Sequence, residues 1–136
     1  MANALYNPYK QQLLDNTTAI DMDGDVIKAS LIDGADYTFS AAHDEYGNNT
    51  DVPTGSIVAA SGALGSPTCT NGTFDTADFT WTAVTGDQSE IILLWDDTVT
   101  NDRLVAYYDT GMTGMPVTPN GGDINVTVHA SGWFAL

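Results

Sequence analysis

The sequence predicts an all-β protein: an antiparallel β-sandwich or jelly-roll-like barrel of about eight short strands with a short N-terminal helix. Segments in which apolar and polar residues alternate recur along most of the chain, separated by clusters of Gly, Asn, Asp and Pro. Only the N-terminal end has apolar residues at helical spacing. No composition shift marks a linker, so we expect one domain over residues 1–136, with 1–15 as an arm or helix and 20–136 as the sandwich.

The N-terminal helix is indicated by its start signals. Asn7 suits the capping position, and Pro8 suits the first helical position. Its apolar residues lie roughly on one side: Leu5, Tyr9, Leu13 and Leu14. A helix of about two turns is not stable alone in water, so we expect it to dock on the sheet or on a neighbouring subunit.

The strands are expected at residues 26–33, 56–61, 78–84, 90–95, 103–109 and 123–130, with 133–136 closing the chain. In the third of these, alternation places Phe79, Trp81 and Ala83 inward. The fourth is a continuous apolar run, "EIILLW", which is typical of a central strand covered on both faces. Residues 39–47 differ, since Ser40 could cap a second helical turn there.

The charge of the chain is strongly unbalanced. Eighteen acidic residues and three basic ones give a formal net charge of −15 at pH 7. Binding to nucleic acid or to an anionic membrane needs Lys and Arg, so we expect neither as a partner. The charge favours a basic protein partner, association with cations, or solubility at high concentration. No apolar run is long enough to span a membrane, and the N-terminus lacks a signal-peptide pattern.

The stretch "DMDGD" raises the question of a calcium loop, because three carboxylates alternate there: Asp21, Asp23 and Asp25. An EF-hand loop starting at the first of them would need glycine at its sixth position and glutamate at its twelfth. Those positions hold Val26 and Ile32. We therefore favour a turn in which Gly24 supplies backbone freedom, and we keep the three residues as a calcium candidate outside the EF-hand class.

No residue pattern predicts an enzyme, a catalytic residue or a cofactor. The carboxylate pairs Asp44–Glu45 and Asp96–Asp97 are sequence neighbours beside turns, whereas acid–base pairs face each other across a cleft. The two histidines, at 43 and 129, have no ligand spacing. The only cysteine, Cys69, cannot form an internal disulfide and is expected to be buried.

The aromatic residues allow two interpretations. Trp81 and Trp95 fall where strand periodicity points inward, which favours core packing over stacking on sugar rings. Trp133 lies three residues from the end, and it could either close the sandwich or contact a neighbour.

Several phrases occur together and in order along nearly the whole chain. They are "MANALYN", "IDMDGDVIKASLIDGADYTF", "HDEYGNNTDVPTG", "VAASGAL", "FDTADFTWTAVTGD", "RLVAYYDTG" and "MPVTPNGGDINVTV". In this respect the chain resembles small virion structural proteins of tailed bacteriophages. The shared phrases are turns and strands, so the resemblance implies no catalytic position.

The resemblance implies a cement or decoration protein that binds the outer surface of the major capsid protein lattice and stabilises the head. It would be a homotrimer or other homo-oligomer on the capsid surface of the virion, assembled in the host cytoplasm. The expected docking residues are aromatic and aliphatic side chains, thought to be exposed, near the two termini: Leu5, Tyr6, Tyr9, Leu13, Trp133 and Phe134. The alternative is a tail- or fibre-associated virion protein, a glycan-binding β-sandwich that contacts the host surface.

Overall fold

The computed structural model describes residues 3–17 and 19–136, so the first two residues of the N-terminal arm lie outside the described part. Its elements are β1 (Ala4–Leu5), α1 (Asn7–Asp15), β2 (Ile27–Ile32), η1 (Thr54–Ser56), β3 (Ile57–Ala60), β4 (Thr68–Thr70), β5 (Thr73–Asp75), β6 (Phe79–Trp81), β7 (Ile91–Asp96), β8 (Arg103–Tyr108), β9 (Ile124–Val126) and β10 (Phe134–Ala135). The predicted all-β class with a short N-terminal helix is confirmed.

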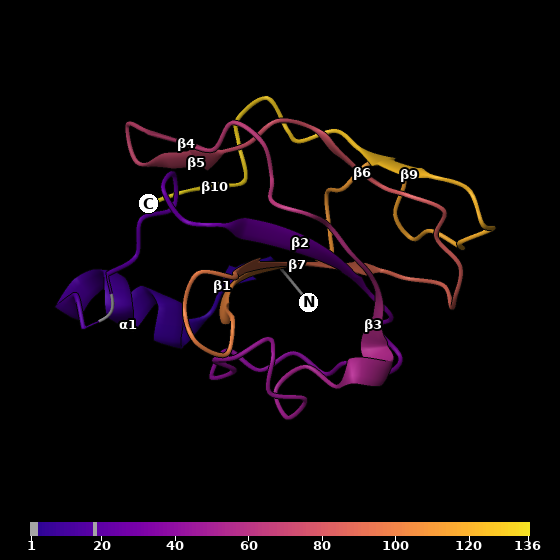
Figure 1. The fold of residues 1–136 in the computed structure, drawn as a ribbon, viewed down its shortest axis with the longest axis horizontal. Helices are drawn as coiled ribbons and strands as arrows, with labels where there is room; N and C mark the ends of the chain where they lie inside the picture. The colour runs from indigo at the N-terminus through magenta and orange to yellow at the C-terminus, as the bar shows by residue number, and fades with distance from the viewer. Residues whose placement is uncertain (1–2, 18) are drawn as a thin grey trace.

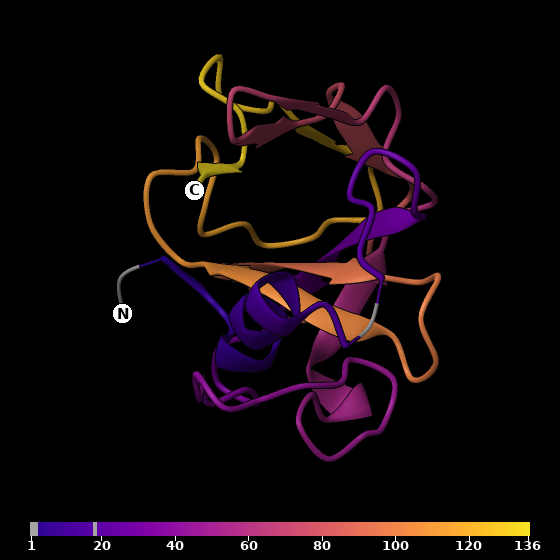
Figure 2. The same cartoon turned by 90° about the vertical axis from the view of Figure 1, so that its left-hand side faces the viewer.

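The strands form three antiparallel sheets. The large sheet has the order β1-β8-β7-β2-β3, and the small sheets have the orders β10-β5-β4 and β6-β9. Both small sheets lie over one face of the large sheet, which gives a sandwich-like arrangement (Figures 1 and 2). The segment between β2 and β3 runs beneath the opposite face, and α1 lies at one end of the large sheet.

Strand β7 is the centre of the large sheet, as the continuous apolar run predicted. It pairs with β2 on one side and with β8 on the other, and all six of its residues are buried. A strand that is covered on both faces has no side facing solvent, so its sequence does not alternate between apolar and polar residues.

The two predicted core tryptophans are buried on opposite faces of the large sheet. Trp81, on β6, donates its indole N–H to the carbonyl oxygen of Ala29 from the small-sheet side. Trp95, on β7, stacks on Tyr46 and donates its indole N–H to the hydroxyl of Ser30. Each buried indole therefore has a partner for its polar end, and core packing is confirmed for both.

Two predicted strands extend beyond the observed ones. Where strand pairing ends, an Asp side chain accepts the backbone N–H group in place of a carbonyl oxygen from a neighbouring strand. The backbone N–H of Ala83 donates to the Asp123 carboxylate, and Ala83 is exposed with a left-handed φ of 50°. Its predicted inward position is therefore wrong. The N–H of Val128 donates to the Asp78 carboxylate, and β9 stops at Val126.

Three further expectations differ from the structure. Residues 39–47 contain a single turn, in which the N–H of His43 donates to the Ser40 carbonyl, instead of a helical segment. Ten strands are described where about eight were expected, and three of them, β1, β4 and β5, lie outside the seven predicted ranges. Cys69 is exposed because β4 is an edge strand whose three residues all face solvent.

Helix α1 starts at Asn7 itself, with Tyr6 in the capping position, and Asn16 closes it in a left-handed conformation. Its one fully buried residue is Tyr9, which meets Phe134 edge-on. Leu14 is 84% exposed, so the predicted apolar side is only partly used. Within the described residues, no helix has the length and apolar character needed to cross a membrane.

Candidate partner-binding groove

A hollow lies between the large sheet and the β6-β9 sheet. It has a volume of about 650 Å³ and is lined by β-strand residues, by the segment between β8 and β9, and by Trp133. Ile92 and Tyr108 come from the large sheet, and Met112 and Met115 come from the connecting segment. The small β6-β9 sheet adds further apolar side chains, Trp81, Ile124 and Val126.

A second, smaller hollow of about 230 Å³ adjoins the first and shares Asn3, Tyr108 and Trp133 with it. Its other walls are Ala4 and Leu5 of β1 and Phe134 and Ala135 of β10. Both strands are edge strands of their sheets. We call the two hollows together the terminal groove, because the two ends of the chain meet there.

Hydrogen bonds hold the N-terminal wall of the groove. The side-chain amide of Asn3 donates to the Thr110 carbonyl at 3.1 Å. Its oxygen accepts the backbone N–H groups of Asp109 at 2.9 Å and of Thr110 at 3.1 Å. The Asn3 side chain thus connects the N-terminal segment to the residues that follow β8.

The C-terminal wall is held by Trp133. The Tyr108 hydroxyl donates to the Trp133 carbonyl at 2.7 Å, and the Trp133 indole N–H donates to the Thr76 hydroxyl at 2.8 Å. Gly132 precedes it with a φ of +80°, and a Cβ there would lie 2.6 Å from the Phe74 carbonyl oxygen. Only glycine fits this close approach, which turns Trp133 into the groove.

The chemistry of the groove suits contact with apolar groups. Of the ionisable residue types, only Tyr108 and His129 line it among the described residues. Burial raises the pKa of Tyr108, so its hydroxyl stays protonated and serves as a donor. His129 accepts the backbone N–H of Ser131 on Nδ1 at 3.0 Å. No carboxylate of the described residues is in the lining of either hollow.

The structure brings together three of the six predicted partner-binding residues. Leu5, Trp133 and Phe134 all line the terminal groove, and each is partly exposed. Tyr6 and Tyr9 are buried, so the expectation that they are exposed aromatics is wrong. The hydroxyls of Tyr6 and Tyr37 share a hydrogen bond beneath the large sheet.

Leu13, the sixth predicted residue, is partly buried against the core and does not line the groove. The sequence did not indicate that the segment between β8 and β9 also lines it. That segment has no periodicity, so its only signal was a concentration of apolar Met112 and Met115 between glycines.

Residues 21–25 form a turn, as favoured above. The backbone N–H groups of Gly24 and Asp25 both donate to the Asp21 carbonyl. The Asp21 N–H donates to the Asp25 carboxylate at 2.9 Å. A Cβ on Gly24 would lie 2.4 Å from the Asp21 carboxylate, but that carboxylate ends an exposed side chain that can move aside, so space alone does not require glycine there. Across the described residues, no group of three or more His, Cys, Asp or Glu side chains could hold a metal ion, so the geometry does not support the calcium candidate.

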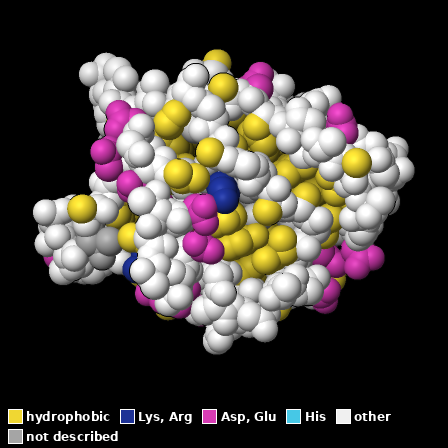
Figure 3. Space-filling view, in the orientation of Figure 1, with side chains coloured by type: hydrophobic (Ala, Val, Ile, Leu, Met, Phe, Trp, Pro, Cys, Tyr) yellow, Lys and Arg dark blue, Asp and Glu magenta, His cyan; other side chains and the backbone are white. Residues whose placement is uncertain are grey.

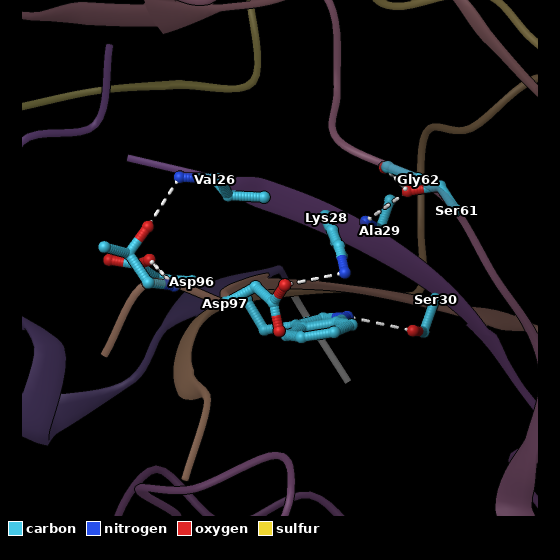
Figure 4. Close-up of polar contacts among 10 residues, drawn as sticks. Val26, Lys28, Ala29, Ser30, Ser61, Gly62, Asp96 and Asp97 are labelled. Carbon is cyan, nitrogen blue, oxygen red and sulfur yellow. Dashed lines mark hydrogen bonds and ion pairs between the residues drawn. The ribbon is translucent and has the colours of Figure 1, made fainter. Parts of the chain in front are cut away.

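The pair Asp96–Asp97 is split by the end of β7. Asp97 forms an ion pair of 2.7 Å with Lys28, whose ammonium also lies 5.3 Å from the centre of the Trp95 ring (Figure 4). Asp96 is 1% exposed and faces Asp25. Burial, with a contribution from Asp25, raises the pKa of Asp96 to about 6.

Hydrophobic side chains gather across the middle of the face seen in Figure 3, where a basic side chain and acidic side chains lie among them, and further acidic side chains lie toward its margins. No protein-family model matches the chain, and no curated protein matches it. A function must therefore be inferred from the groove, the charge and the sequence resemblance.

Proposed function

We propose that this protein is a non-enzymatic structural component of a bacteriophage virion. In this role it is a cement or decoration subunit that binds the outer surface of the major capsid protein lattice and stabilises the head. The observation that supports this best is the terminal groove, in which Leu5, Trp133 and Phe134 from the two chain ends form one open apolar surface. Such a surface suits a protein partner better than it suits chemistry, since the described residues of its lining are largely apolar and include no carboxylate.

The size of the groove is compatible with this role. A subunit that repeats over a symmetric shell, as a homotrimer or other homo-oligomer, gains avidity from several modest contacts. The net charge of −15 keeps particles apart and disfavours contact with the packaged genome. Both features fit a protein on the capsid surface of the virion, assembled in the host cytoplasm.

Copy number in purified particles is the first test. A head-coating subunit is expected on the order of hundreds of copies, whereas a tail protein is present as a small multiple of three or six. A small copy number would contradict the cement role.

A substitution in the groove tests how the subunit docks. Deleting residues 2–14 is unsuitable, because it removes β1 and the buried Tyr6 and Tyr9 from the fold. Ala135→Trp instead fills the smaller hollow from an exposed position. Ala63→Trp, also at an exposed alanine but outside the groove, is the matched control. We expect heads that lack the subunit to bind the control protein and to lose at least about tenfold in affinity for Ala135→Trp.

A second candidate is a tail- or fibre-associated protein that contacts glycans on the host surface. It is favoured by the partly exposed aromatic side chains in the lining, Tyr108 and Trp133, since aromatic rings stack on sugars. This candidate also predicts that carboxylates lie beside the aromatic rings. No carboxylate is in the described part of the lining. Binding on a glycan array together with a low copy number would favour this candidate over the first.

A further inference from the structure

We infer that the terminal groove takes an extended cationic segment of a partner protein, one in which apolar residues alternate with Lys or Arg. This inference rests on the proposed function and specifies the chemistry of the partner at the same surface. It combines the apolar lining of the groove, its position between two sheet edges, and the acidic groups that adjoin it.

The large hollow has room for apolar side chains. Its volume of about 650 Å³ is within the usual range for binding pockets, roughly 300–1,000 Å³. Met112 and Met115 form one wall, and methionine adapts its shape to irregular partners. Trp81 is almost fully buried, so a side chain that enters the hollow meets a surface fixed by the core.

The position of the groove favours an extended segment. Edge strands β1 and β10 line the smaller hollow, and each has a strand partner on one side only among the described strands. Sheet edges bind extended peptides by adding main-chain hydrogen bonds, and alternate side chains then enter the adjoining pocket.

Acidic groups lie immediately around the apolar lining. The Asp78 carboxylate accepts the N–H of Val128, a lining residue, at 2.8 Å. The Asp75 side chain lies 3.3 Å from where a Cβ on Gly132 would be, and Gly132 lines the large hollow. Asp109 is not counted among these groups, because its carboxylate accepts the hydroxyl of Tyr107, which does not line the groove.

The basic residues are placed elsewhere. Lys28 pairs with Asp97, Arg103 pairs with Asp44, and Lys10 lies on α1. None of the three lines the groove. At the groove, an acidic partner would therefore be repelled, and so would the acidic surface of a second copy of this chain, so contacts between copies in a homo-oligomer are expected elsewhere on the molecule. A cationic segment complements the surface.

Two synthetic peptides of equal length test the inference: an extended ten-residue peptide alternating Leu with Lys, and the same peptide with Glu in place of Lys. Binding to the full chain is measured by tryptophan fluorescence at 50 and 300 mM NaCl. We expect the Lys peptide to bind at least about tenfold more tightly than the Glu peptide, and to weaken as salt rises. Equal binding, stronger binding of the Glu peptide, or no binding of either peptide would overturn the inference.

Variants locate the binding. Ala130→Trp blocks the large hollow from an exposed position and is expected to abolish binding of the Lys peptide, whereas Ala63→Trp leaves it unchanged.

The double variant Asp75→Asn/Asp78→Asn is expected to weaken Lys-peptide binding about three- to tenfold at low salt. Asn retains the oxygen that each backbone N–H uses, so the fold is preserved. Asp36→Asn, at an exposed position outside the groove, is the charge control. Equal effects of the double variant and this control would count against the inference.

The two proposals can fail separately. A protein that coats phage heads but ignores both peptides refutes the cationic segment and leaves the cement role intact. A protein that binds the Lys peptide through the groove but never binds heads refutes the cement role and supports the inference about the groove.

Discussion

The hydroxyl of Tyr108 donates a hydrogen bond of 2.7 Å to the backbone carbonyl of Trp133, and this contact ties the large sheet to the last strand of the chain. Both residues line both hollows of the terminal groove. The groove therefore depends on a contact between the end of β8 and the residue just before β10.

Removing that hydroxyl tests how firmly the C-terminal wall is held. Tyr108→Phe keeps the ring but leaves a partly buried carbonyl without its donor, which is expected to cost about 1–2 kcal/mol of unfolding free energy. Urea unfolding monitored by tryptophan fluorescence measures the change. An unchanged unfolding midpoint would mean that the other hydrogen bonds of Trp133, from its indole N–H to Thr76 and from its backbone N–H to Phe74, hold it without the Tyr108 hydroxyl.

Gly132 is expected to tolerate no side chain. Gly132→Ala would place a Cβ 2.6 Å from the Phe74 carbonyl at a φ of +80°, so clash and strain add. We expect a loss of about 3 kcal/mol or more in urea unfolding. Gly111→Ala is the matched control, because its φ is +76° but nothing lies within 4 Å of the new Cβ. That variant should lose only about 1 kcal/mol. Similar losses for the two variants would contradict the close approach at Gly132.

The hydroxyl of Ser30 serves two buried aromatic residues. It shares a hydrogen bond of 2.7 Å with the Tyr46 hydroxyl and accepts the Trp95 indole N–H at 2.9 Å. Ser30→Ala leaves both groups unpaired in the core and is expected to cost about 2–4 kcal/mol. Ser61 also bonds to backbone groups beside β2, but it is partly exposed (Figure 4). Ser61→Ala should cost less, because water can replace its hydroxyl. Equal costs in guanidinium unfolding would show that burial does not decide the difference.

The carboxyl group of Asp96 makes stability depend on pH. Its pKa is raised by burial to about 6, so the folded protein holds this proton more tightly than the unfolded chain does. The resulting stabilisation is fully present below about pH 4 and is lost as pH rises through about 6. Asp96→Asn is therefore expected to be more stable than the parent at pH 7.5, by up to about 3 kcal/mol. It should also show a flatter stability profile between pH 4.5 and 7.5.

The exposed Asp36 supplies the control for this pH dependence. Asp36→Asn removes the same charge from the surface and should leave the shape of the profile unchanged. If both variants follow the same profile in denaturant unfolding at each pH, general repulsion among the acidic residues explains the dependence and Asp96 does not.

Residues 21–25 are expected to bind no calcium at sub-millimolar concentrations. The carboxylate of Asp25 already accepts the Asp21 N–H, and no metal-binding group is formed among the described residues. Isothermal titration of the purified protein with Ca²⁺ should give no heat beyond dilution. Saturable heat in that range would reinstate the calcium candidate.

The sequence alone determined the parts of this fold that depend on local pattern. Strands β2, β7 and β8 were predicted to within a residue or two, because alternation or a continuous apolar run reports directly how many faces of a strand are covered. The hairpin of β4 and β5 was missed, since all three residues of β4 are exposed and its sequence therefore shows no alternation between buried and exposed positions.

Only the tertiary structure decided which of these elements are neighbours. Leu5 and Phe134 lie at opposite ends of the sequence yet line one hollow, and Asp96 faces Asp25 instead of acting with Asp97. Local periodicity records whether a side chain is buried, and it carries no information about the distant strand that buries it. The sequence therefore predicted partner-binding residues near the two chain ends. Only the folded chain shows that some of them form one surface, the terminal groove.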